Sequence, residues 1–167
     1  MPGSTLRVAM ICTGNICRSP MAEVALAQMV AEDEVLRGRV EVTSAGTANW
    51  HVGSSMDPRA RRALDRAGLD GPARSGAYAD RAYLDGQDLV AVMTREHWKD
   101  VRRRLTNEST EVIMLRNLVS PGLDLDVADP YYGDDREFDE CLEMLRECCR
   151  RLTLGFRQRL GAGSFGA

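Results

Sequence analysis

The sequence has no hydrophobic run that could span a bilayer, no excess of positive charge and no dense set of cysteines. The apolar segment 6–11 is far shorter than the roughly 20 residues of a membrane helix, and no cleavable signal pattern precedes it. The formal net charge of −3 gives no general attraction to nucleic acid or to an anionic membrane. Five sparsely spaced cysteines do not make the even set of a secreted disulfide framework. We therefore expect a cytoplasmic protein that binds neither nucleic acid nor membranes.

Length and composition are those of one globular domain. The 167 residues are 44% hydrophobic and 28% charged, enough to bury a core without disulfides or metals. No internal repeat, linker or low-complexity block divides the chain. We expect one domain over residues 1–160 and a flexible, glycine-containing tail over residues 161–167.

Strand-like and helix-like segments alternate along the chain. Short hydrophobic runs predict strands at 5–11, 38–44, 88–93 and 111–115. Apolar residues at helical spacing predict helices over 18–30, 58–67, 95–105 and from about 136 onward. Asp57 and Thr94 are the expected N-caps, and Gly68 is the expected stop of the second helix. This alternation predicts an α/β fold with a mostly parallel sheet and helices on both faces.

The strongest functional signal is a cysteine and an arginine separated by five residues, between the first strand and the first helix. The start of a helix offers unpaired N–H groups and partial positive charge, which suit a phosphate. Arg18 adds a planar fork for two phosphate oxygens, and Gly14 is expected to supply the positive φ of a tight loop. These surroundings favour the thiolate of Cys12, which is the nucleophilic form. The predicted phosphate loop comprises Thr13, Gly14, Asn15, Ile16, Cys17, Arg18 and Ser19.

A second signal is the run Asp129-Pro130-Tyr131-Tyr132. Pro130 restricts Asp129 to an extended backbone. A thiolate that displaces an oxygen leaving group needs a proton donor there, and the next step needs a base for water; one carboxyl group can do both. Such a run alone is common in surface turns. Its pairing with the cysteine loop makes Asp129 the candidate general acid.

These motifs resemble the low-molecular-weight protein tyrosine phosphatases. The likeness rests on the Cys12 to Ser19 loop, Ser44-Ala-Gly-Thr47 after the second strand, Trp50, and Asp129-Pro-Tyr131. It extends from residue 6 to about 160 in the same order and spacing. It implies hydrolysis of phosphotyrosine in proteins through a phosphocysteine intermediate, without metal or cofactor. The implied fold is a four-stranded parallel sheet of order 2-1-3-4, and the expected oligomeric state is a monomer.

The resemblance also assigns roles to individual residues. Cys12 is the implied nucleophile, Arg18 the phosphate clamp and Asp129 the general acid. Asn15 shapes the loop by hydrogen bonding, and Ser19 supports the thiolate.

Three aromatic residues are the implied walls of the substrate slot. An aromatic slot gives stacking and depth, so a phosphorylated phenol reaches Cys12 whereas phosphoserine is too short. The residue beside the first wall, His51, is expected at the surface and away from catalysis. The walls are Trp50, Tyr131 and Tyr132.

Two further features follow from the comparison with the family. Many members carry a histidine after the second helix that supports the loop asparagine, whereas residues 71–75 here contain none. The usual support for Asn15 is therefore missing. Members with a pair like Cys12 and Cys17 form a reversible disulfide under oxidation, which implies redox protection; the alternative is that Cys17 only fills the first helical turn.

Two rival functions share parts of this motif set. An arsenate reductase of the same fold would carry relay cysteines in mid-chain, but residues 78–92 contain none. The remaining cysteines fit one buried face of the last helix instead. A non-catalytic phosphotyrosine-binding or redox-sensing module would need neither Cys12 nor Asp129. The helix-face cysteines are Cys141, Cys148 and Cys149.

A zinc site is the third alternative. Its ligands would be Cys12, Cys17 and His51, but the cysteine spacing and the loop between them suit an anion better than a metal.

Overall fold

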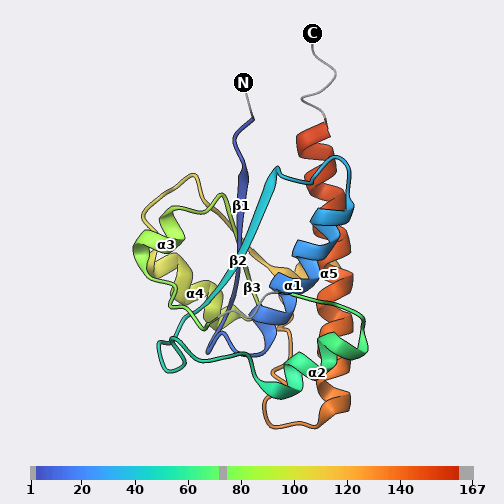
Figure 1. Cartoon of the computed structure of the whole chain (residues 1–167). Coiled ribbons are helices and arrows are strands. Elements are labelled where there is room, and N and C mark those ends of the chain that lie inside the picture. Colours follow the sequence, from blue (N-terminus) through green and yellow to red (C-terminus); the bar gives the residue numbers. More distant parts are fainter. Residues whose placement is uncertain (1–2, 72–74, 162–167) are drawn as a thin grey trace.

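The computed structural model describes residues 3–71 and 75–161, in which strands and helices alternate (Figure 1). Four of the helices and all four strands were predicted from sequence, whereas the short α3 and the 3-10 helix were not. Gly161 of the expected tail ends the last helix, and residues 162–167 lie outside the described part. In chain order the elements are β1 (Leu6–Cys12), α1 (Arg18–Glu32), β2 (Val40–Gly46), α2 (Pro58–Arg66), α3 (Arg81–Asp85), β3 (Leu89–Val92), α4 (Arg95–Arg104), β4 (Glu111–Met114), η1 (Leu115–Leu118) and α5 (Asp135–Gly161).

The four strands form one parallel sheet in the order β2-β1-β3-β4, as the family resemblance implied. In this sheet β1 lies at the centre, with Cys12 opposite Gly46 of β2 and Ile11 opposite Val92 of β3. The chain changes direction across the sheet between β1 and β3, so the loops that leave their carboxyl ends diverge and open a crevice. The Cys12 loop starts at that crevice.

One prediction about β2 was wrong. The strand was expected to end at residue 44, with the Ser44 to Thr47 motif following it. Instead β2 continues to Gly46, because its pairing with β1 extends as far as Cys12. Ser44 is therefore a strand residue whose position is fixed by the sheet.

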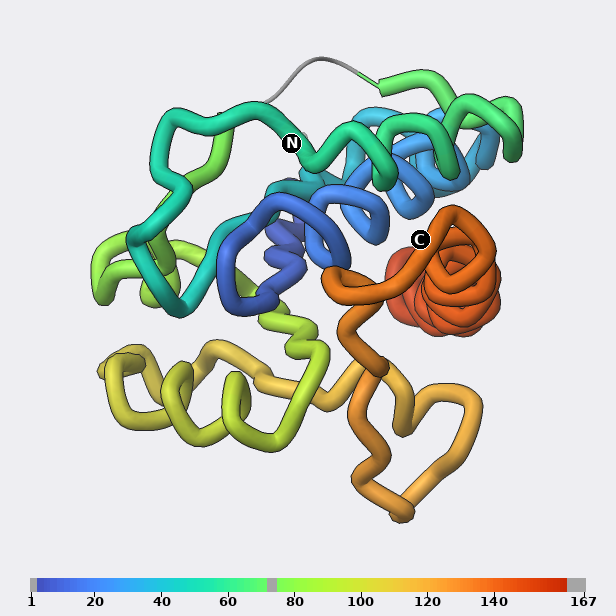
Figure 2. The backbone as a smooth tube through the Cα atoms, turned by 90° about the horizontal axis from the view of Figure 1, so that it is seen from below, coloured from blue at the N-terminus to red at the C-terminus, as the bar shows by residue number. Residues whose placement is uncertain are grey.

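The alternating side chains of β1 build two core layers. Val8, Met10 and Cys12 pack with α1, α2 and α5, while Ala9 and Ile11 pack with α3 and α4. Figure 1 and Figure 2 show this division, with α1, α2 and α5 on one side of the sheet and α4 on the other. Helices therefore cover both faces, as predicted. None of the helices in the described ranges is long and apolar enough to cross a membrane.

The predicted helix signals are confirmed. The Asp57 side chain accepts from the Arg59 N–H at 2.8 Å, and the Thr94 hydroxyl accepts from the His97 N–H at 3.2 Å. Gly68 follows α2 with a φ of 70°. One face of α5 is buried as its apolar spacing predicted, through Phe138, Cys141, Leu142, Leu145, Cys148, Cys149 and Leu152.

Gly46 is where the sheet and the Cys12 loop approach most closely. A Cβ there would overlap the Thr13 carbonyl oxygen and would lie 3.2 Å from the Asn15 nitrogen. Because both are backbone atoms, we expect Gly46→Ala to lower the free energy of unfolding by about 1–3 kcal/mol. Urea denaturation of the variant and the wild type measures this difference in the free energy of unfolding, provided that both have the same m-value.

Gly155 provides the matched control. It is exposed in α5, and a Cβ there would meet nothing within 4 Å. Gly155→Ala should therefore raise the free energy of unfolding by about 0.5–1 kcal/mol. Equal stability of Gly46→Ala and the wild type would contradict the proposed crowding.

Candidate active site

The predicted phosphate loop joins β1 directly to α1. Cys12 is the last residue of β1, and Arg18 is the first residue of α1. The expectation that Gly14 supplies the positive φ was wrong, because Asn15 does so, with a φ of 58°. Asparagine tolerates this region better than most residues. A Cβ at Gly14 would lie 2.8 Å from Cδ2 of the His51 ring, so a larger residue there would move that side chain.

The loop turns its carbonyl groups toward the protein and leaves its N–H groups unpaired. Across the described part of the chain, no backbone carbonyl accepts a hydrogen bond from the N–H groups of residues 13–18. Successive free N–H groups in a tight turn, followed by a helix start, form an anion-binding concavity. The carbonyl oxygens of Cys12, Thr13, Ile16 and Cys17 accept from the N–H groups of Thr47, Ala48, Asp57 and Met21, respectively.

The Cys12 sulfur has a defined hydrogen-bond partner. It lies 2.9 Å from the hydroxyl oxygen of the buried Ser19. That oxygen already accepts from Asn15 Nδ2 at 2.8 Å. The hydroxyl proton is therefore free to be donated to the sulfur, which is the arrangement that stabilises a thiolate.

Asn15 is well supported without the family's histidine. Its Nδ2 donates to Ser44 Oγ at 2.9 Å as well as to Ser19, and its Oδ1 accepts from the Ala77 N–H at 2.9 Å. Residues 72–74, where the histidine would be sought, lie outside the described residues. Ser44 in β2 and the backbone at Ala77 hold the side chain that the sequence alone left without a partner.

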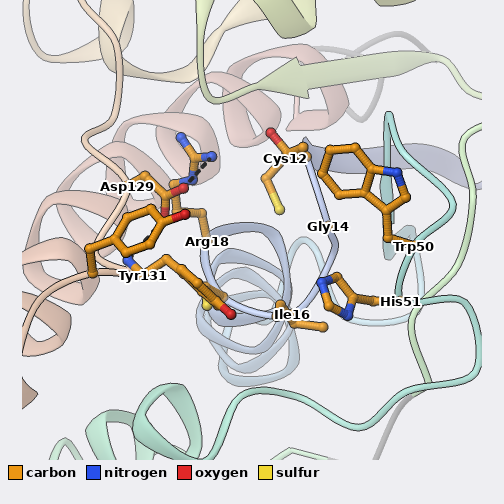
Figure 3. Close-up of a pocket in the computed structure, with 11 residues that line it drawn as sticks. Cys12, Gly14, Ile16, Arg18, Trp50, His51, Asp129 and Tyr131 are labelled. Carbon is orange, nitrogen blue, oxygen red and sulfur yellow. Dashed lines mark hydrogen bonds and ion pairs between the residues drawn. The ribbon is translucent and has the colours of Figure 1, made fainter.

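Arg18 connects the phosphate loop to the loop that carries Asp129. The Arg18 side chain is almost fully buried; its Nη1 donates to the Val127 carbonyl at 3.0 Å, and its Nη2 lies 3.5 Å from Asp129 Oδ2. Asp129 itself is about half exposed, and its Oδ1 accepts from the Tyr131 N–H at 3.1 Å. The three residues expected to do the chemistry therefore surround one space, which Cys12 faces (Figure 3).

This space is a pocket of about 280 Å³. The three predicted aromatic walls line it, and they are far from buried: Trp50 is 74% and Tyr132 is 95% exposed. His51, expected to be a surface residue rather than a catalytic one, lines the pocket beside Trp50 (Figure 3). Asn15 and Ser19 of the predicted set lie behind the lining instead. The lining residues are Cys12, Thr13, Gly14, Ile16, Cys17, Arg18, Trp50, His51, Asp129, Tyr131 and Tyr132.

Arg59 is a further residue that the sequence did not reveal as part of the site. Its guanidinium lies over the rings of Tyr131 and Phe138, at 5.4 and 4.6 Å from the ring centroids. It donates to the Gly133 carbonyl at 3.0 Å and forms an ion pair with Asp57, whose pKa it lowers below the usual range. Arg59 thus fastens the aromatic wall to the start of α2. The only sequence signal was its position two residues after an N-cap.

The remaining thiols are protonated at neutral pH. Burial, reinforced by the Asp57 carboxylate, raises the pKa of Cys17 far above its usual value. Burial also raises the pKa of Cys141 to about 12 and that of Cys148 to about 11. Among the described residues no group of three or more His, Cys, Asp or Glu side chains is placed to hold a metal ion, so the zinc alternative has no geometric support.

Comparison with known proteins identifies the family. The model of the low molecular weight phosphotyrosine protein phosphatase family matches residues 7–162. A low molecular weight protein-tyrosine-phosphatase of Streptomyces coelicolor is 41% identical over 162 residues, which cover 93% of this chain and 96% of that protein.

Two solved structures share the fold. The crystal structure of YfkJ from Bacillus subtilis superposes with a TM-score of 0.84 at 27% identity, covering 95% of this chain and 99% of that one. The YwlE arginine phosphatase from Geobacillus stearothermophilus gives 0.80 at 29% identity, covering 92% and 94%. Sequence and structure agree that the chain belongs to the low molecular weight phosphotyrosine protein phosphatase family, a family of cysteine-dependent hydrolases.

Proposed function

We propose that the protein hydrolyses phosphotyrosine in proteins, and aryl phosphates generally, through a phosphocysteine intermediate. Cys12 is the nucleophile, Arg18 binds the phosphate and Asp129 is the general acid. The observation that carries this proposal is the meeting of these three side chains at one pocket whose floor is a loop of unpaired N–H groups.

In the first step the phosphate dianion occupies the floor of the pocket. The N–H groups of residues 13–18 and the Arg18 guanidinium bind its oxygens, and Arg18 gives up its contact with Asp129 to do so. The Cys12 thiolate attacks phosphorus in line, so that the S–P bond forms while the bond from phosphorus to the tyrosine oxygen breaks. Asp129 donates a proton to the departing phenoxide.

In the second step water releases the phosphate. The Asp129 carboxylate accepts a proton from a water molecule, the water oxygen bonds to phosphorus, and the S–P bond breaks. The electron pair returns to the Cys12 sulfur, where the Ser19 hydroxyl stabilises the charge by the hydrogen bond already present. Free enzyme and inorganic phosphate result.

The walls of the pocket favour a phenyl ring over a shorter side chain. Trp50 and Tyr131 rise on different sides of the Cys12 sulfur (Figure 3), so a planar ring can fit between them while its phosphate reaches the floor. Phosphoserine is too short to do both. Phosphoarginine is long enough, and one structural relative is named an arginine phosphatase. The aromatic lining supports phosphotyrosine as the preferred substrate.

The two rival functions predict different chemistry. Arsenate reduction would need further thiols that carry the oxidation from Cys12 to an outside reductant, yet the α5 cysteines are buried. Arsenate reduction sustained by thioredoxin would reverse the assignment. A binding-only module would hold phosphate without releasing it from an ester, which turnover measurements decide.

We place the enzyme in the cytoplasm as a monomer that acts on phosphotyrosine-containing proteins. All five cysteines are unpaired, which suits a reducing compartment.

Burst kinetics with aryl phosphates test the chemical roles. Cys12→Ser should show neither burst nor turnover, because it lacks the nucleophile. Asp129→Asn should slow the hydrolysis of phenyl phosphate by about 10²–10⁴-fold, which is the usual contribution of a general acid. It should slow p-nitrophenyl phosphate much less, because that leaving group needs no proton. Asp124→Asn, an exposed carboxylate on the same loop, is the matched control. Equal losses for both substrates would remove Asp129 from the role of acid.

Peptide substrates test the slot. The kcat/KM for a phosphotyrosine peptide should exceed that for the phosphoserine peptide at least about a hundredfold, and it should exceed that for phosphoarginine. Trp50→Ala should lower the phosphotyrosine value by about two- to tenfold through lost stacking. Trp98→Ala, an exposed tryptophan on α4 outside the pocket, should leave it unchanged. A preference for phosphoarginine would reassign the substrate.

Peroxide treatment tests the redox role that the family implies for Cys17. Peroxide converts the Cys12 thiolate to a sulfenic acid, and the Cys17 thiol then displaces its oxygen as water to form a disulfide. Wild type should recover activity with dithiothreitol, whereas in Cys17→Ser the sulfenic acid reacts with more peroxide to give a sulfinic acid, so most of the activity should be lost irreversibly. Cys148→Ser, another buried thiol, is the control. Recovery of Cys17→Ser to the wild-type level would show that Cys17 only fills space.

A further inference from the structure

One histidine of the chain is buried directly behind the phosphate loop. His97 lies in the first turn of α4, which follows β3, the neighbour of β1 in the sheet. Its side chain is only 3% exposed, and its Nε2 lies 2.7 Å from the Thr13 hydroxyl oxygen. The sheet order therefore brings a residue of α4 against the first residue after the nucleophile.

The other ring nitrogen of His97 has no partner. Among the buried side-chain atoms of the described residues, Nδ1 is one of the few without a hydrogen bond. A buried N–H without an acceptor is rarer in proteins than an unpaired acceptor, so the ring proton belongs on Nε2. His97 then donates to Thr13 Oγ1, and Nδ1 carries the unused lone pair.

The surroundings keep the ring uncharged. Burial, reinforced by the nearby Arg18 guanidinium, lowers the pKa of His97 to about 4, although Asp126 and Asp129 act in the opposite direction. The position near the start of α4 works in the same sense as Arg18, because the helix dipole is positive there. The ring is therefore neutral at every pH well above 4 and gains a proton only in acid.

Thr13 is held from two sides as a result. Its carbonyl oxygen accepts from the Ala48 N–H at 3.0 Å, and its hydroxyl oxygen accepts from His97. Its own N–H has no backbone acceptor in the described part of the chain, and the residue lines the pocket. The carbonyl contact fixes the peptide group that carries the Gly14 N–H, and the hydroxyl contact fixes the Thr13 side chain, so together they hold the start of the loop in place.

We propose that neutral His97 is a positioning residue, which holds Thr13 through Nε2 and so keeps the phosphate loop in its anion-binding arrangement. Only the kcat/KM measurement for this proposal rests on the proposed function. The affinity for inorganic phosphate is measured without turnover and does not depend on it. If His97 were only a core residue of α4, its substitution would lower the stability of the protein and leave the affinity for phosphate unchanged.

Phosphate protection of Cys12 from alkylation by iodoacetate gives the affinity directly. His97→Leu and Thr13→Val should each weaken phosphate binding by about three- to tenfold, the loss expected for one neutral hydrogen bond. The double variant should be no weaker than the single ones, because both remove the same contact. His97→Gln, whose amide can donate from a similar position, should restore most of the affinity. The kcat/KM for phenyl phosphate should follow the same order.

Val101→Ala is the matched control, since Val101 is fully buried in α4 and does not line the pocket. It should lower the melting temperature while leaving phosphate affinity at the wild-type value. Phosphate affinity unchanged in both His97→Leu and Thr13→Val would overturn the proposal. If His97→Leu does not fold, Thr13→Val and His97→Gln still decide. A wild type that binds phosphate without hydrolysing esters would end the proposed function alone, and one that binds no phosphate would end both.

Discussion

The phosphate loop keeps its N–H groups free on the inner side, while its carbonyl groups on the outer side are hydrogen-bonded to the surrounding protein. Unpaired backbone donors are costly, so a turn that collects them exists only where other contacts impose its shape. Here the carbonyl groups of the loop bond to the residues after β2 and to the start of α2, and Asn15 holds the turn from within. Gly46 lets the sheet approach closely enough for these bonds. The binding site is thus a consequence of how the loop is supported.

The sheet order explains why distant segments meet at this loop. Because β1 is central, the chain that follows β2 and the chain that follows β3 both pass its carboxyl end. The first brings Trp50 and His51, and the second brings α4. The loop after η1 completes the site, where the Val127 carbonyl and Asp129 meet the Arg18 guanidinium.

The parts of the site that could be predicted came from local spacing and from the family resemblance, which assigned distant residues such as Asp129 and Trp50 to the same pocket. Cys12 and Arg18 belong to one turn, so their separation and the flanking strand and helix sufficed. Local spacing carries no record of partners far along the chain, which is why the contacts of His97 and Arg59 were missed. The assignment of the positive φ to Gly14 failed because the Asn15 side-chain contacts fix the backbone there. The absence of the family's histidine could be read from sequence, but the contacts of Asn15 with Ser44 and with the Ala77 backbone could not.

The floor and the rim of the pocket obey different physical demands. Arg18 at the floor and Asn15 and Ser19 directly behind it are almost fully buried, and each has defined hydrogen-bond partners, so their geometry is fixed before a ligand arrives. At the rim, Trp50 and Tyr132 remain exposed and give up the stabilisation that burial of such large side chains would provide. These exposed aromatic side chains become buried only when the ring of a substrate enters between them. On the proposed function, the floor therefore determines the chemistry on phosphorus, and the rim determines which phosphate ester reaches it.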